Sequence, residues 1–221
     1  MKYTSINALA GGQLVGAIAT LLMGLLALPV VFVSDTASAP TILMMLTSGI
    51  GIIICFIAMF VSLIITLVAI FHLRRQSKYF GYALMVVGLA FAIGIVGAIL
   101  GEIVAKDTSV DGLLSVFALV MDIASAKCIF SGLAELAASN GLPELRSRME
   151  KAYPVYRNSV LLLIILTIAT VIVGALLSEA AGIMNIGLII ITLLMSLLEF
   201  FFSYYFYIRL IRLAGRELNA N

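Results

Sequence analysis

The amino-acid sequence predicts an all-α fold: a polytopic integral membrane protein, built as a bundle of six transmembrane helices with both termini in the cytoplasm. Hydrophobic residues make up 63% of the 221 residues and charged residues only 11%, whereas soluble domains carry about 25% charged residues. Six long apolar segments follow one another, and lysines and arginines gather in alternate turns between them. A chain of this composition has too few polar side chains to cover a surface that faces water.

The apolar segments predict the helices one by one, because only helices and closed barrels satisfy the backbone in lipid. Their apolar residues run without alternation, which favours helices over strands, and crossing a bilayer takes about 17 to 25 residues. The predicted helices span residues 13–33, 42–73, 82–104, 113–137, 160–177 and 186–213. Together they use most of the chain, which predicts a single membrane domain over residues 1–221.

Polar residues mark the end of each predicted helix in turn. The first ends at a turn-prone stretch that reaches Pro40, the second at Arg74, and the third at Lys106. The fourth is the least apolar of the six, and a polar, cytoplasmic-looking stretch over residues 139–159 follows it. A short turn over residues 179–185 separates the fifth helix from the sixth. These boundaries leave little chain for anything besides the bundle.

The first helix also has features of a secretory signal peptide. Lys2 precedes its apolar run, and Ala37-Ser38-Ala39 follows it as a small-residue motif of the kind that signal peptidase cleaves. The apolar core of a signal peptide is typically about 7–15 residues long, and this run is longer. We therefore expect the first helix to be retained; its cleavage would leave five helices and an external N-terminus.

The distribution of basic residues predicts the orientation. The three turns on one side of the membrane hold a single basic residue, Lys106. The opposite side holds Lys2, Arg74, Arg75, Lys78, Arg146, Arg148, Lys151, Arg157, Arg209, Arg212 and Arg216. Because cytoplasmic loops are enriched in Lys and Arg, this bias predicts that both termini are cytoplasmic. Most of the tyrosines gather at the same ends of the helices, where amphipathic rings settle.

Small residues recur at every fourth position along the first helix, namely Ala8, Gly12, Gly16, Thr20 and Gly24. This spacing places them on one helix face, where short side chains let another helix approach closely. The pattern predicts close helix packing. The partner is either a helix of this chain, which is the interpretation we prefer, or a helix of another membrane protein.

Three polar residues, Asp122, Ser125 and Lys127, interrupt the fourth helix. An ionised side chain at the bilayer centre costs at least about 2.5–3.5 kcal/mol, so such residues face the protein interior and find partners. Glu199 in the sixth helix lies at a similar predicted depth. We therefore predict a Lys127–Glu199 pair and an intramembrane polar site of Asp122, Ser125, Lys127 and Glu199. These charges either line a hydrated path for a cation, a proton or a polar solute, or only fix the helix arrangement.

Several classes of chemistry have no support in the sequence. With His72 as the single histidine there is no multi-histidine metal motif, and no P-loop or G-x-S-x-G motif occurs. No basic run is long enough to bind nucleic acid. Cys55 and Cys128 sit inside apolar segments without a C-x-x-C motif, and we interpret them as packing residues. We expect no metal, no cofactor and no catalytic residues, and an enzyme is the function with the least support.

The preferred functional hypothesis is a small transporter or transporter subunit for an ion or small polar solute. The alternative is a non-enzymatic scaffold or accessory protein that binds another membrane protein, or a second copy of itself, through the helix 1 stripe. No family motif is recognised, but the size, the six spans and the stripe are similar in architecture to the substrate-binding membrane subunits of energy-coupling-factor transporters. That resemblance implies a transport role. The expected surroundings are the lipid bilayer, specifically the bacterial cytoplasmic (inner) membrane.

Overall fold

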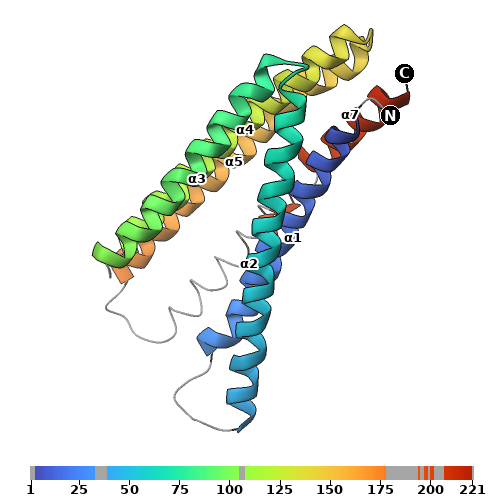
Figure 1. Cartoon of the computed structure of the whole chain (residues 1–221). Coiled ribbons are helices and arrows are strands. Elements are labelled where there is room, and N and C mark those ends of the chain that lie inside the picture. Colours follow the sequence, from blue (N-terminus) through green and yellow to red (C-terminus); the bar gives the residue numbers. More distant parts are fainter. Residues whose placement is uncertain are drawn as a thin grey trace.

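The computed structural model describes residues 3–32, 39–104, 108–177 and 207–220, together with Leu194, Leu197, Leu198, Phe200 and Phe201. Within these residues the chain is all-helical and contains no strand, which confirms the predicted fold class (Figure 1). The described helices are α1 (Thr4–Phe32), α2 (Ala39–Leu73), α3 (Lys78–Val104), α4 (Thr108–Ser139), α5 (Pro143–Leu177) and α7 (Arg209–Ala220).

Five of the described helices, α1 to α5, are long and apolar enough to cross a membrane. Their outward surfaces carry large apolar side chains that are mostly uncovered: Met85 is 71% exposed, Phe56 66% and Ile165 63%. Monomeric soluble proteins rarely expose so many large apolar side chains, whereas a surface in contact with lipid requires them. The helices therefore support an integral membrane protein.

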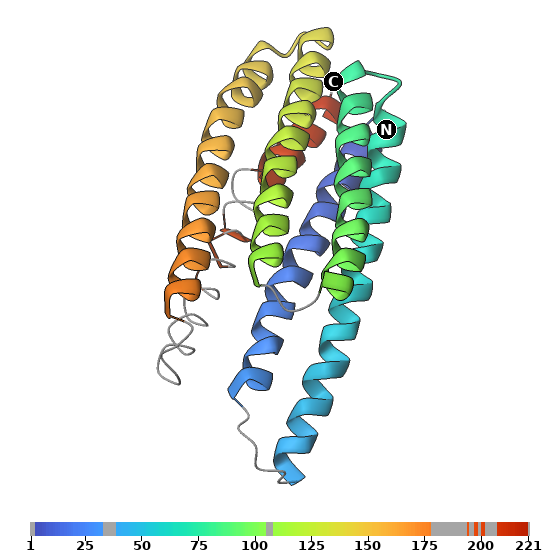
Figure 2. The ribbon, with the colours of Figure 1, turned by 90° about the vertical axis from the view of Figure 1, so that its left-hand side faces the viewer.

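The helices form two groups that meet at one end of the molecule. α1 and α2 pair along their lengths, while α3, α4 and α5 pack side by side (Figures 1 and 2). The two groups converge at the end that holds both termini and diverge toward the other end. α7 lies at the shared end, against α1, α4 and α5. Among the described residues, the groups are joined by α7 and by the contact between α2 and α3.

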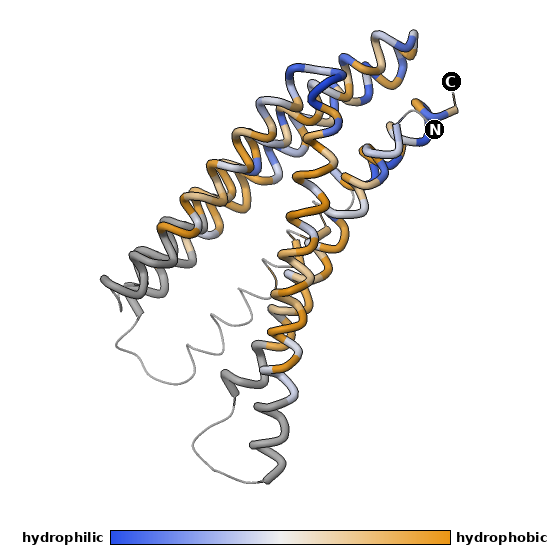
Figure 3. Tube along the Cα trace, viewed as in Figure 1, coloured by the Kyte–Doolittle hydropathy of each residue, from blue (hydrophilic) through white to orange (hydrophobic). Residues whose placement is uncertain are grey.

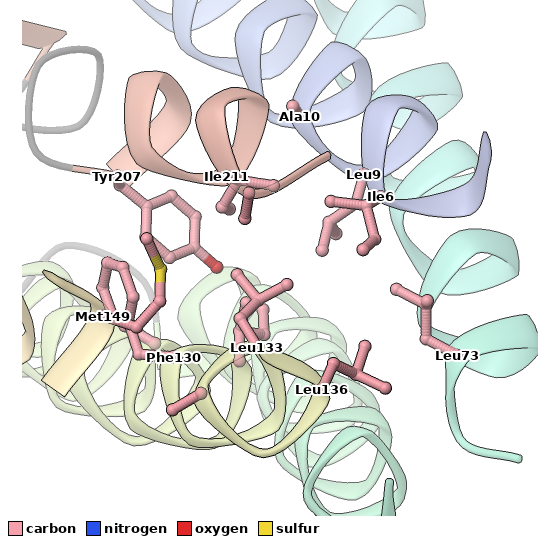
Figure 4. Packing of buried hydrophobic residues seen from close by; sticks show 14 of the residues in the cluster. Ile6, Leu9, Ala10, Leu73, Phe130, Leu133, Leu136, Met149, Tyr207 and Ile211 are labelled. Atoms are coloured by element: carbon pink, nitrogen blue, oxygen red, sulfur yellow. The ribbon is translucent and has the colours of Figure 1, made fainter. Parts of the chain in front are cut away.

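The hydrophobic core lies at this shared end of the bundle. Ile6 and Leu9 of α1, Phe130 of α4 and Ile211 of α7 belong to one buried cluster and are each at most 2% exposed (Figure 4). Coloured by hydropathy, the described hydrophilic residues gather at the same end (Figure 3). The protein is thus held together where its polar residues and its termini lie.

A helix C-cap sets the turn between α4 and α5. Gly141 has φ +71°, a left-handed conformation that glycine adopts without strain. The N–H of Leu142 donates to the carbonyl of Ala137 at 2.9 Å, and the N–H of Gly141 donates to that of Ala138 at 3.2 Å. This pair of bonds is a Schellman motif. Pro143 then begins α5, a position where proline loses no helical hydrogen bond.

Two helices begin well before the apolar segments that predicted them. α1 begins at Thr4, not at residue 13, and α5 begins at Pro143, not at residue 160. Most of the stretch over residues 139–159 is therefore helical, not a polar loop. Leu145, Met149 and Tyr156 in that stretch are buried at helical spacing. Hydropathy averages over both faces of a helix, so it finds the part in lipid and misses an amphipathic extension.

The sixth predicted helix, residues 186–213, lies largely outside the described residues. Its last residues belong to α7, which continues to Ala220. α5 ends at Leu177 at the end of the bundle opposite the termini, whereas α7 lies back at the shared end (Figures 1 and 2).

Candidate functional site

A cavity of about 370 Å³ lies between the two helix groups, next to the buried core. All five long helices contribute to its wall. It is lined by Gln13, Gly16, Met59, Ser62, Leu63, Thr66, Val87, Ala90, Phe91, Met121, Asp122, Ser125, Tyr156 and Tyr207. Pockets that bind small molecules measure about 300–1,000 Å³ and combine an apolar wall with a few polar groups. This cavity meets both criteria.

Two of the four residues predicted for an intramembrane polar site line this cavity, Asp122 and Ser125 of α4. They lie three residues apart and so share one helix face. The Ser125 hydroxyl donates to the backbone carbonyl of Asp122 at 3.1 Å. From the end of α4 at Ser139, Asp122 lies about 26 Å back along the helix, at a rise of about 1.5 Å per residue.

The remaining polar wall comes from residues that the sequence did not single out. Gln13 belongs to α1, and Ser62 and Thr66 belong to α2. Ser62 and Thr66 lie one turn apart and are 6% and 3% exposed. Two hydroxyls at this spacing in an otherwise apolar helix are a sequence signal for a polar face. The signal is weak, because serine and threonine are common in membrane helices as packing residues.

An aromatic cluster forms the boundary between the cavity and the core. Tyr156 of α5 and Tyr207 stack with ring centroids 5.3 Å apart and planes 30° apart. The ring of Phe130 meets the rings of Tyr156 and Tyr207 edge-on at centroid distances of 6.3 Å and 5.6 Å. Both tyrosines belong to the buried cluster and also line the cavity. The cavity is thus closed by stacked aromatic rings on the side toward the termini.

Gly12 and Gly16, from the predicted stripe on the first helix, lie against α2. A Cβ atom on Gly16 would lie 2.6 Å from the Ser62 hydroxyl oxygen, and one on Gly12 would lie 2.9 Å from the Thr66 hydroxyl oxygen. The Ser62 hydroxyl donates to the carbonyl of Gly12 at 2.6 Å, across the helix pair. At Gly12 a side chain would also meet the Ser62 backbone carbonyl oxygen at 3.2 Å, whereas at Gly16 the Ser62 hydroxyl alone would have to move.

The other predicted site residues have different positions. Ala8 and Thr20 are exposed, and the Thr20 hydroxyl donates to the Gly16 carbonyl at 3.0 Å within α1. Gly24 lies further along α1. Lys127 is exposed on α4 and does not line the cavity. Glu199 lies outside the described residues, so the Lys127–Glu199 pair stays a prediction.

A second hollow of about 340 Å³ lies near the shared end, lined by residues of α3, α4 and α5 that include Glu135, Arg146 and Glu150. Arg146 and Glu150 form an ion pair at 2.7 Å, with side chains 56% and 53% exposed. The Ser77 hydroxyl donates to the Glu135 carboxylate. These groups are already paired with one another and open to solvent, so the first cavity is the better candidate for a functional site.

Comparison with known proteins gives no relative for this chain, since no family model, curated protein or solved structure matches it. Any functional argument therefore rests on the cavity itself.

Proposed function

We propose that the protein is a small membrane transporter, or the solute-binding subunit of one, and that the cavity between the helix groups is its binding site for an ion or small polar solute. The observation that supports this most is the placement of Asp122, Ser62 and Gln13 on the wall of one cavity inside an otherwise apolar bundle. Placing a carboxylate in a membrane helix costs free energy because the group loses its hydration, and such residues mark solute and ion pathways. Packing alone would be better served by apolar side chains at these positions.

We also propose that the chain crosses the membrane six times, with both termini in the bacterial cytoplasm. Tyr3 and α7 lie at the same end of the bundle, and the backbone N–H of Tyr3 donates to the Asn219 side chain at 2.9 Å. After five crossings the chain has to return once more for its two ends to meet. The exposed Arg74, Arg75 and Arg216 lie at that end, as the positive-inside rule expects of the cytoplasmic side.

The alternative, an accessory protein that binds a partner through the helix 1 stripe, has less support from the geometry. Gly12 and Gly16, the two stripe residues that would permit the closest approach, face α2 of the same chain. Ala8 and Thr20 are the stripe residues on the outer surface of the described bundle. Among the stripe residues whose exposure the structure describes, a partner helix would therefore meet the larger ones, Ala8 and Thr20.

Site-directed labelling tests the transporter proposal. In a background with Cys55 and Cys128 replaced by alanine, Ser125→Cys places a thiol on the cavity wall. Leu89→Cys is the matched control, because Leu89 is 52% exposed on the outer face of α3 while its neighbours Ala90 and Phe91 line the cavity. Both proteins are reconstituted in liposomes and treated with a membrane-impermeant methanethiosulfonate reagent, first outside and then inside.

We expect the thiol of Ser125→Cys to react much faster than that of Leu89→Cys, because methanethiosulfonates react with the hydrated thiolate. A transporter exposes its site to each side in turn, so labelling should proceed from both faces of the membrane. Equal, slow reaction of the two variants from both faces would mean a dry bundle, and the proposal would be wrong.

A further inference from the structure

A layer of buried side chains lies between the cavity and the end of the bundle that holds the termini. The five long helices and α7 each contribute to it a residue whose side chain is fully buried: Ile6, Leu73, Phe80, Leu133, Met149 and Ile211. Protein interiors are packed so closely that few gaps admit even a water molecule. A solute in the cavity therefore reaches this end of the bundle only when part of the layer moves.

Tyr207 lies where this layer meets the cavity. It is 5% exposed, belongs to the buried cluster and lines the cavity. Its ring stacks on that of Tyr156, with centroids 5.3 Å apart, and meets the ring of Phe130 edge-on at 5.6 Å. Figure 4 shows the Tyr207 ring pointing from the segment that leads into α7 toward Phe130 of α4. Removing this one ring from its place would open the layer beside the cavity.

The chain at Tyr207 has the features of a hinge. Tyr207 and Ile208 lie in a π-helical turn directly before α7. Such turns are rare, recur at functional sites and are places where helices bend. α7 itself is only 12 residues long. The ion pair that links it to α5, Arg148–Glu217 at 3.4 Å, joins side chains that are 52% and 33% exposed, and ion pairs in contact with solvent stabilise little. A short element held in this way opens more readily than a long packed helix.

We propose that Tyr207 is the gate of the cavity on the side of the termini, and that α7 carries it. The described conformation is the closed one. When α7 moves away from α1, the Tyr207 ring leaves Tyr156 and Phe130, and the cavity opens to that face of the membrane. This inference rests on the proposed function, because it states how the same site gains access to one of the two faces.

A disulfide between α1 and α7 tests the gate by holding it shut. A Cβ on Gly215 would lie 3.2 Å from the Cγ of Asn7, and a cysteine sulfur would take the place of that Cγ. Asn7→Cys and Gly215→Cys can therefore form a disulfide with little movement of the helices. Both changes are added to the Ser125→Cys protein that lacks Cys55 and Cys128. The matched control carries serine at positions 7 and 215, which keeps the side chains small and cannot crosslink.

Both proteins are oxidised, reconstituted in liposomes and treated from each face with the impermeant methanethiosulfonate. Mass spectrometry of the peptide that contains position 125 gives the rate of its modification. We expect the disulfide to slow modification from the face that holds the termini by about tenfold or more, because the rate is proportional to the fraction of open molecules. Modification from the opposite face should be unchanged, which also shows that the thiol at position 125 is still free.

Equal rates in the crosslinked and control proteins would overturn the gate inference while the transporter proposal stands. A control that reacts from the opposite face alone would overturn it too, because the gate then does not open. If the disulfide does not form, α7 does not lie against α1 as described, and the inference fails. If position 125 of the control reacts from neither face, the transporter proposal itself fails.

A second measurement removes the gate ring and needs no crosslink. Tyr207→Ala in the Ser125→Cys protein should speed modification from the face of the termini by about tenfold or more, whereas Tyr207→Phe, which keeps the ring, should leave it unchanged. Tyr153→Ala is the matched control, because Tyr153 of α5 packs against the same core but is not among the residues that line the cavity. If Tyr207→Ala and Tyr153→Ala have equal effects, or if neither has one, Tyr207 is not the gate.

Discussion

The contact between Gly16 and Ser62 allows the helix 1 packing to be tested by a single methyl group. In Gly16→Ala the added Cβ would lie 2.6 Å from the Ser62 hydroxyl oxygen, well inside the 3.4 Å at which ordinary contact begins, while its next neighbour, the Ser62 Cβ, is at 3.5 Å. The hydroxyl is therefore the single atom that has to move. When it rotates away, it gives up its 2.6 Å hydrogen bond to the Gly12 carbonyl.

The expected size of the effect follows from that lost bond. A hydrogen bond between membrane helices contributes about 0.6 kcal/mol on average and up to about 1.7 kcal/mol, and a buried hydroxyl left unpaired costs about 1–3 kcal/mol. Replacing glycine by alanine in a helix also stabilises the helix by about 1 kcal/mol, because alanine has the higher helix propensity. Gly11→Ala removes this last contribution from the comparison, since a Cβ on Gly11 meets nothing within 4 Å. We expect Gly16→Ala to be about 1–2 kcal/mol less stable than Gly11→Ala.

Reversible unfolding in mixed detergent micelles measures both free energies of unfolding. A double-mutant cycle with Ser62→Ala then isolates the contact, because this change removes the atom that clashes. In the Ser62→Ala background, Gly16→Ala should behave like Gly11→Ala. If Gly16→Ala and Gly11→Ala are equally stable in the original background, α1 and α2 do not approach as closely as described, and the packing argument is refuted.

Two further contacts give predictions of the same kind. Gly132→Ala should lower the free energy of unfolding by about 1–3 kcal/mol, because its Cβ would lie 2.8 Å from the fully buried ring of Phe80. Gly88→Ala should not lower it, because a Cβ on Gly88 meets nothing within 4 Å. Equal stability of the two variants in unfolding measurements would disprove the packing of α3 on α4. Tyr3→Phe should cost about 0.5–1.5 kcal/mol, because the Asn140 side chain donates to the Tyr3 hydroxyl at 2.9 Å, and an unchanged unfolding midpoint would contradict that bond.

Much of the fold could be predicted from the sequence because the bilayer leaves few options. Long apolar runs have to be helices in lipid, and the structure describes five such helices. The amphipathic start of α5 escaped prediction for a physical reason. Its buried residues recur every three or four positions among charged ones, so the mean hydropathy of the stretch resembles that of a loop. Only periodicity distinguishes an amphipathic helix from a polar linker.

The candidate site was predictable only where its residues share a helix. Asp122 and Ser125 lie three positions apart, which places them on one face, whereas Lys127 is five positions from Asp122 and lies about 140° around the helix at about 100° per residue. Lys127 accordingly does not line the cavity. Gln13, Ser62 and Tyr207 join the wall from helices far apart in the sequence. A single sequence carries no local signal for contacts between residues so far apart in the chain.

The position of α7 also determines the order in which the molecule can be completed. α7 follows the five long helices in the chain, so it leaves the ribosome after they do. Its buried Ile211 and Leu218 join the cluster that includes Ile6 and Leu9 of α1, and its Gly215 packs against Ile6. Until α7 arrives, the side of α1 that it covers is exposed, and exposed apolar surface makes unfinished chains prone to aggregation. This end of the bundle is therefore completed only when α7 packs onto it, and a chain that stops before α7 leaves the α7-facing side of α1 without that cover.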